Sequence, residues 1–296
     1  MKLKLEKSGK KRILAFHLLP ILALSVLITA VYSQDKTMSE KDKMKLIQQH
    51  YTDAIKYFST GDYAKAIRYW EEILKLDPAQ TQPRKLIPAA RTKLQDKNKI
   101  LLIELKKSYI VGKYEDALEK ISRLVENDPS NSYLTDLSDL LQNVTDNIGN
   151  RPGDDKTSRY IRTAIANLIE TPDKIRKTFN ILIYLSQITK DTGIKEFLKY
   201  LAKNNPVEYS SIQIIPGVDL LEQKIVATLN YIYDGKYDRA IMECNEVLEI
   251  DPVNITAMKR LGSAYYALKK TDKAKQVWQE ALKLNPSDKE LKSFMK

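Results

Sequence analysis

The chain has 296 residues, enough for one or two domains, and its 43% hydrophobic content is sufficient for a folded core. The 29% of charged residues and the 9 glycines favour helix over sheet, and a single cysteine, Cys244, excludes an internal disulfide framework. The net charge of +11 is that of many nucleic-acid-binding proteins. However, residues 1–12 hold much of it, and the other lysines are interleaved with acidic residues, so the pattern predicts solvated helix faces and no nucleic-acid partner.

The first 32 residues have the pattern of a membrane signal. Residues 1–12 contain six basic residues and one acidic residue, and the apolar run Ile13–Tyr32 contains no Asp, Glu, Lys or Arg. Twenty helical residues rise about 30 Å, which matches the hydrocarbon core of a bilayer. Because the basic residues precede the run, we expect a cytoplasmic tail over 1–12 and a transmembrane signal-anchor over 13–32.

A cleaved signal peptide is the alternative. Val31-Tyr32-Ser33 could serve as a cleavage site, although the run is longer than the apolar core of about 7–15 residues typical of such peptides. No cysteine directly follows the run, which excludes a lipoprotein anchor. In both alternatives the rest of the chain lies outside the cytoplasm, and polar residues 33–46 are predicted to be a tether.

Four windows of 18 residues share one pattern. They are Gly61–Pro78, Gly112–Pro129, Gly235–Pro252 and Lys269–Pro286. Their sixth place is always alanine, and large apolar residues or cysteine recur at the tenth and fourteenth places, so these three places lie along one helical face. The opening glycine can end a preceding helix, and the closing proline stops the helix of the window.

These windows resemble the second helices of tetratricopeptide repeats, whose unit of about 34 residues folds as two antiparallel helices. The last two windows end 34 residues apart, and Leu261, Gly262 and Tyr265 stand where the family has its Leu-Gly-x-x-Tyr in a first helix, here Ile255–Leu268. The resemblance implies an all-α solenoid of stacked hairpins, with an N-terminal repeat pair over 47–130 and a C-terminal pair over 217–296.

The spacing between the first two windows is irregular. They start 51 residues apart rather than 34, and the extra 17 residues predict a helix over Pro83–Asp96 that continues into Lys99–Val111. A helix over Asn131–Ile148 follows and ends at Asn147–Asp155, the strongest helix-breaking stretch in the chain.

The central region, residues 131–216, lacks the repeat signature. Its periodicity predicts further helices over Ser158–Glu170, Asp173–Lys190 and Gly193–Asn204, resembling a degenerate repeat, and an extended segment over Pro206–Gly217. Ser287 and Glu290 have capping-box spacing, which predicts a final helix that covers the end of the stack.

The resemblance also implies a partner-binding groove, lined by the first helix of each unit. Carried over to this sequence, the groove residues are Tyr51, Ile55, Phe58, Leu102, Lys106, Tyr109, Ile225, Leu229, Ile232, Tyr233, Lys259, Ser263 and Tyr266. Tyr51 and Ile55 replace the Lys and Asn with which some members bind acidic chaperone tails, so an apolar peptide or a partner helix suits the groove better. For units one and three, burial of these side chains against neighbouring helices of the same chain is an equal alternative.

No catalytic, cofactor or metal site is predicted. The sequence has no phosphate-binding loop, no H-E-x-x-H and no C-x-x-C, and its two histidines are isolated. Cys244 occupies a packing column, which is typical of a small buried hydrophobe.

The features together predict a non-catalytic protein-interaction scaffold. It is anchored in the inner membrane of a bacterial cell envelope with a periplasmic repeat body, binds no small-molecule substrate and docks partners of an envelope assembly. Anchored repeat proteins of this kind resemble those that build collars around the periplasmic flagellar motor or assist cell-envelope biogenesis. The alternative is an accessory subunit of an enzyme, or a hydrolase, that acts on the cell wall.

Overall fold

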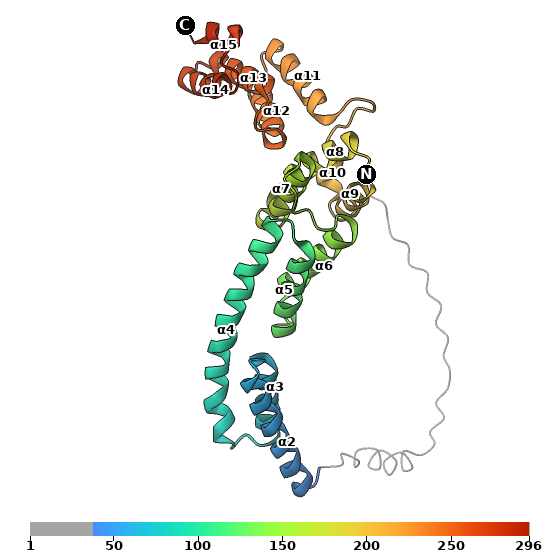
Figure 1. Cartoon of the computed structure of the whole chain (residues 1–296), viewed down its shortest axis with the longest axis vertical. Helices are drawn as coiled ribbons and strands as arrows, with labels where there is room; N and C mark the ends of the chain where they lie inside the picture. The colour runs from blue at the N-terminus through green and yellow to red at the C-terminus, as the bar shows by residue number, and fades with distance from the viewer. Residues whose placement is uncertain (1–37, 296) are drawn as a thin grey trace, which may run out of the picture.

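The computed structural model describes residues 38–295, and every regular element within that range is helical. The helices form an elongated stack, with α2 and α3 at one end and α14 and α15 at the other (Figure 1). In chain order, the elements are α2 (Glu40–Ser59), α3 (Tyr63–Leu76), α4 (Thr81–Ile110), α5 (Tyr114–Asn127), α6 (Ser132–Asn147), α7 (Lys156–Glu170), the 3-10 helix η1 (Pro172–Lys174), α8 (Ile175–Ile188), α9 (Thr192–Asn204), α10 (Pro206–Ser210), α11 (Leu220–Tyr233), α12 (Tyr237–Ile250), α13 (Ile255–Ala267), α14 (Thr271–Leu284) and α15 (Lys289–Phe294).

The four windows form the second helices of hairpins, namely α3, α5, α12 and α14. Their alanines at the sixth place are fully buried, and so is the residue at the tenth place, except Trp278, which is nearly so. The fourteenth place is only half-buried, and the thirteenth is buried instead, as Ile73 and Leu124 illustrate. The buried face at the C-terminal end of the helix therefore includes the thirteenth place instead of the predicted fourteenth. One residue corresponds to a rotation of about 100° around the helix.

The start of each window turns the chain between two antiparallel helices. Gly112 adopts a φ of 77°, and a Cβ there would lie 2.3 Å from the carbonyl oxygen of Arg151, so only glycine fits. In the fourth window, Lys269 adopts the same left-handed conformation with a φ of 58°, which explains how that turn forms without glycine.

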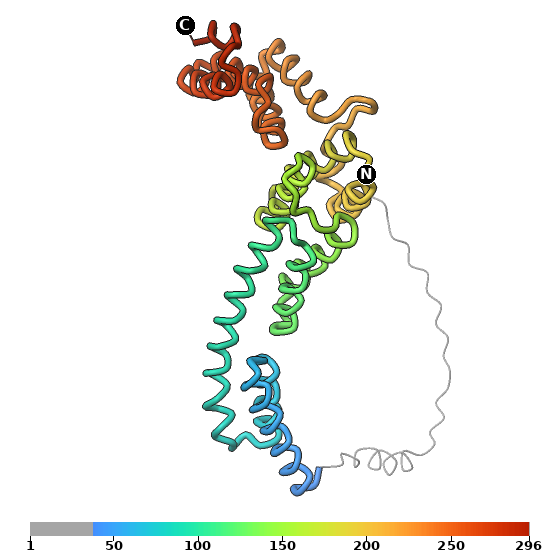
Figure 2. The backbone as a smooth tube through the Cα atoms, in the orientation of Figure 1, coloured from blue at the N-terminus to red at the C-terminus, as the bar shows by residue number. Residues whose placement is uncertain are grey.

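The extra residues between the first two windows form part of one continuous 30-residue helix, α4. Its first half packs Ile87 and Ala90 into a core cluster with α2 and α3, and its second half packs Leu101 and Leu105 into a larger cluster with α5. In Figure 2, α3 and α5 lie one after the other along the same side of α4. The long helix therefore joins two hairpins that barely contact each other directly.

The larger cluster is one core that runs from Leu101 in α4 to Ala257 in α13. It includes the central helices α6 to α9 and the first hairpin of the C-terminal pair. The central region consequently continues the stack and does not separate two modules.

The helix-breaking stretch after α6 is held in place by Arg151. The backbone N–H of Arg151 donates to the carbonyl oxygen of Gly112 at 2.7 Å, and its guanidinium pairs with Asp191 at 2.6 Å. Since Asp191 caps the N-terminus of α9, this single residue connects the start of α5 to the start of α9.

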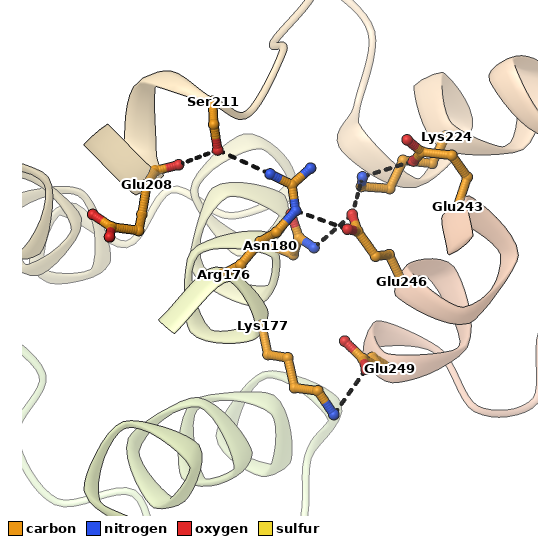
Figure 3. Close-up of polar contacts among 9 residues, drawn as sticks. All are labelled: Arg176, Lys177, Asn180, Glu208, Ser211, Lys224, Glu243, Glu246 and Glu249. Atoms are coloured by element: carbon orange, nitrogen blue, oxygen red, sulfur yellow. Dashed lines mark hydrogen bonds and ion pairs between the residues drawn. The ribbon is translucent and has the colours of Figure 1, made fainter. Parts of the chain in front are cut away.

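A charged network joins the central region to the C-terminal pair (Figure 3). Glu246 of α12 accepts hydrogen bonds from Arg176 Nε at 2.7 Å and from Asn180 Nδ2 at 3.0 Å, both on α8. Lys224 of α11 is buried between Glu246 and Glu243, with its Nζ 2.9 Å from the Glu243 carboxylate. Burial alone would raise the pKa of Glu246, but the hydrogen bonds from Lys224 and Arg176 outweigh it and hold that pKa below its ordinary value.

Three local predictions are wrong. The tether expected over 33–46 is shorter, because α2 begins at Glu40 with Ser39 as its N-cap. The segment expected to be extended, Pro206–Gly217, starts with the short helix α10, since a proline at the first position favours a helical turn. Asp288, and not Ser287, caps α15: its carboxylate accepts from the N–H groups of Glu290 and Leu291.

The predicted cytoplasmic tail 1–12 and the signal-anchor 13–32 lie outside the described residues. Within residues 38–295, no helix is both long enough and apolar enough to cross a membrane.

Candidate functional site

The first helices of the C-terminal pair, α11 and α13, pack against each other and run in the same direction, because each is antiparallel to α12 between them. Arg260 of α13 fixes their separation: its guanidinium donates to the carbonyl oxygen of Ile225 and to the Thr228 hydroxyl, the latter at 3.2 Å. This contact ties Ile225 and Thr228 of α11 to α13, so the two helices present one continuous face.

Helix α11 buries two polar side chains beside the apolar Leu220 and Leu221. Lys224 and Thr228 are buried, whereas Ile225, Leu229 and Ile232 are only half-buried. Val226 is 51% exposed on the same side of the helix, and Tyr233 at its end is 80% exposed. Lys224 joins the interior network, and several apolar side chains of α11 remain partly or largely accessible.

Helix α13 extends this surface with one further aromatic ring. Tyr266 is 60% exposed, and its ring centroid lies 5.9 Å from that of Trp278, which anchors it. Tyr233 and Tyr266 both occupy the last turn of parallel helices, so they lie at the same end of the face. We define the C-terminal docking surface as Ile225, Val226, Leu229, Ile232, Tyr233 and Tyr266.

Comparison with known families identifies the repeat. A tetratricopeptide repeat model matches residues 231–296, and a second tetratricopeptide repeat model matches residues 54–80. The chain is a tetratricopeptide repeat protein. These repeats indicate a protein–protein interaction scaffold.

Solved structures also match, at low identity. The MamA protein is 17% identical over 82% of this chain and 93% of that chain, with a TM-score of 0.22. The TPR2AB domain of yeast Sti1, solved in a complex with pHSP90, is 15% identical over 85% of this chain and 82% of that chain, with a TM-score of 0.30. The TPR domain of P58(IPK) is 17% identical over 84% of this chain and 63% of that chain, with a TM-score of 0.24. No curated protein sequence matches the chain.

In the first tetratricopeptide repeat, most of the predicted groove residues contribute to internal packing. The ring of Phe58 lies 5.6 Å from that of Trp70, and the Tyr51 hydroxyl donates to Gln80 Oε1 at 3.2 Å. Only Ile55, at 52% exposure, faces solvent. The alternative of burial against the same chain therefore describes Tyr51 and Phe58.

In the second repeat, helix α7 covers the predicted groove. The buried Tyr109 donates from its hydroxyl to Glu170 of α7 at 3.0 Å, and the Lys106 ammonium pairs with the same carboxylate at 2.9 Å. Burial, together with this hydrogen bond, raises the pKa of Tyr109. Leu102 remains 46% exposed beside them.

In the fourth repeat, the capping segment engages the predicted groove residue Lys259, and Ser263 bonds within its own helix. Lys259 pairs with Asp288 at 2.7 Å and with Glu290 at 2.6 Å, and Ser263 donates to the carbonyl oxygen of Lys259 at 3.0 Å. Of the 13 predicted groove residues, five thus remain together as an accessible set, all on the C-terminal docking surface. Val226, which is not among the predicted groove residues, completes the surface.

Cys244 and His50, whose side-chain types often serve in catalysis or metal binding, pack against other side chains of the chain. Burial raises the pKa of the Cys244 thiol to about 12, so the reactive thiolate is scarce at neutral pH. His50 stacks beside Tyr69 with its ring centroid 5.4 Å away. Among residues 38–295, no group of three or more His, Cys, Asp or Glu side chains is arranged to hold a metal ion.

Proposed function

We propose that this chain is a non-catalytic docking scaffold of a bacterial cell envelope. An anchor at residues 13–32 holds it in the inner membrane, and the repeat body lies in the periplasm, where it assembles partner proteins. The C-terminal docking surface carries the proposal, because it combines half-buried aliphatic residues with two exposed tyrosines.

The composition of this surface favours an apolar peptide or the apolar face of a helix as its ligand. Tyrosines contribute a large contact area at a small cost in conformational entropy, and interface hot spots are rich in them. A helix that lies along α11 can bury Ile225, Leu229 and Ile232 while both tyrosines close over one end.

Substitution of Tyr233 tests the docking function. Tyr233→Glu places a charge on the surface but removes no buried contact, so the mutant should lose its crosslinked partner in membranes while its helical circular dichroism is unchanged. Tyr133→Glu is the matched control, since Tyr133 on α6 is 60% exposed and lies outside this surface. Equal partner capture by both mutants would contradict the proposed site, and a large loss of helicity in Tyr233→Glu would show that Tyr233 is a core residue.

The proposed location has a separate test. A phosphatase reporter that is active only in the periplasm, fused after the last residue, should be active in cells, because the basic residues before residue 13 favour a cytoplasmic N-terminus. Activity of a cytoplasm-specific reporter at the same position would contradict the periplasmic location without affecting the docking surface.

A further inference from the structure

Helix α4 holds the positive charge of the described chain. It contains eight basic residues and two acidic ones, a net charge of +6, whereas all the residues from 38 to 295 together carry +5. The remainder of the described chain is therefore close to neutral. Two of its basic residues are paired with acidic residues of neighbouring helices, Arg91 with Glu71 and Lys106 with Glu170.

The side of α4 opposite its buried face carries a second periodic pattern. We define the outer stripe as Ala89, Lys93, Asp96, Ile100, Ile103, Lys107 and Ile110. These positions alternate in steps of four and three residues, which is the spacing of a seam between two packed helices. If α4 only connected two hairpins, its solvent-facing side would not require apolar residues at this spacing.

The outer stripe is open along its length in the described chain. Ile100, Ile103 and Ile110 are 58%, 50% and 43% exposed, and the main contacts of α4 are with α3, α5 and α7. Figure 1 shows α4 at the outer edge of the molecule, with these three helices to one side of it. Exposed isoleucines at seam spacing are costly to leave in water, at about 25 cal/mol for each Å² of apolar surface.

Basic residues in and beside the outer stripe lack internal ion-pair partners. In the described part of the chain, no carboxylate lies within ion-pairing distance of Lys93, Lys99 or Lys107, although Arg91 and Lys106 of the same helix are paired. The unpaired ammonium groups can therefore form ion pairs with carboxylates of another molecule.

A depression borders the middle of the outer stripe. It has a volume of about 380 Å³ and lies between α4 and the turn from α2 to α3; its lining residues are Gly61, Tyr63, Lys93, Asp96, Lys97 and Ile100. The Lys93 ammonium lies 6.0 Å from the centre of the Tyr63 ring, so the depression has an aromatic wall and a basic rim. It can receive one large apolar side chain of a helix packed on the stripe.

We propose that the outer stripe of α4 docks an amphipathic helix of another protein, with an aliphatic seam and acidic residues beside it. Isoleucines supply the contact. The ammonium groups of Lys93 and Lys107 within the stripe, and of Lys99 beside it, select the acidic partner. A second copy of α4 is disfavoured, because it would oppose two helices of net charge +6. This interface is distinct from the C-terminal docking surface, so Tyr233→Glu should leave it unchanged.

The test uses the full chain in zwitterionic lipid nanodiscs and two synthetic amphipathic helical peptides. The peptides have identical leucine and isoleucine seams, flanked either by glutamates or by lysines. Fluorescence anisotropy should show binding of the glutamate peptide alone, and the binding should weaken as salt rises. Ile103→Asp, and separately the double mutant Lys93→Glu/Lys107→Glu, should each weaken it by about tenfold or more.

Matched controls exclude general effects. Ile55→Asp on α2 changes an isoleucine of nearly equal exposure, 52% against 50%, and Lys41→Glu/Lys45→Glu changes two exposed lysines of the same hairpin; both mutants should bind like the wild type. Equal binding of the two peptides, or equal loss in Ile55→Asp and Ile103→Asp, would overturn the proposal.

Two further results would also overturn the proposal, because each would show that something else occupies the outer stripe. If anionic phosphatidylglycerol in the nanodiscs abolishes peptide binding, a lipid surface covers the stripe. If Ile103→Asp converts a dimer to a monomer in sedimentation, a second copy covers it. The proposal predicts no effect of phosphatidylglycerol and the same oligomeric state for both proteins.

Discussion

Single residues matter most where the C-terminal pair meets α8. Lys224 and Glu246 are buried together, and the Glu246 carboxylate also accepts hydrogen bonds from Arg176 and Asn180. A charge in such a place is tolerated only while its partners remain, because removing one partner leaves the other charged group desolvated.

Glu246→Ala should therefore lower the free energy of unfolding by about 3 kcal/mol, the lower end of the range for breaking a buried pair, since Lys224 keeps Glu243. Urea denaturation followed by circular dichroism measures the change. Glu249→Ala, which removes a partly exposed pair with Lys177, should cost less than about 1 kcal/mol. Similar losses of unfolding free energy in the two mutants would show that the buried network stabilises the fold no more than a partly exposed ion pair does.

The same carboxylate predicts how stability depends on pH. Because the pKa of Glu246 is lowered in the folded protein, its contribution is complete above the ordinary value of 4.5 and is lost as the pH falls through the lower folded value. The difference in unfolding free energy between the wild type and Glu246→Gln should thus be constant near neutral pH and shrink below pH 4.5. A difference that grows in acid would contradict the lowered pKa.

Among the elements, α4 is the one on which the N-terminal repeats depend. Its two halves serve separate core clusters, and the neighbouring hairpins contact each other little. Polar bridges reinforce its middle: Lys97 donates to the carbonyl oxygen of Gly61 at 2.8 Å, and Asn127 donates to Asn98 at 2.7 Å. Continuity of the helix is therefore what fixes the first repeat to the second.

Lys99→Pro should interrupt α4 at an exposed position, with a cost of about 3 kcal/mol or more, because proline removes a backbone donor and clashes with the preceding turn. Native-state hydrogen exchange should show lost protection in α2, α3 and α4, and unchanged protection in α11 to α14. Lys99→Ala is the control and should behave like the wild type. A uniform loss along the chain would contradict the division into separate core clusters.

The elements also show what the sequence can predict. The repeat windows predict α3, α5, α12 and α14, since alanine spacing and closing prolines are local signals. The excess of 17 residues predicts the long helix, and the helix runs through the internal Pro88 without ending. In contrast, α10 has only five residues, too few for periodicity to reveal, and spacing does not resolve whether Ser287 or Asp288 caps α15.

At the scale of the whole molecule, the candidate site could be predicted only in part. Tyr233 and Tyr266, which the family positions include, are exposed on first helices. The family positions do not indicate that α7 covers Tyr109 or that α15 engages Lys259, because the sequence does not specify which distant helix packs on each face.

One continuous core from Leu101 to Ala257 places the C-terminal docking surface and the outer stripe on the same rigid stack. A scaffold of this form can hold two partners at a fixed separation without catalysing a reaction.

Site-specific photocrosslinking in intact cells tests the docking function most directly. A photoreactive amino acid replaces Tyr233, Tyr266 or, as the control, Tyr133, which is exposed to the same degree as Tyr266, 60%. The account predicts that positions 233 and 266 capture the same protein and that position 133 does not. Equal capture at all three positions, or capture at position 133 alone, would contradict it.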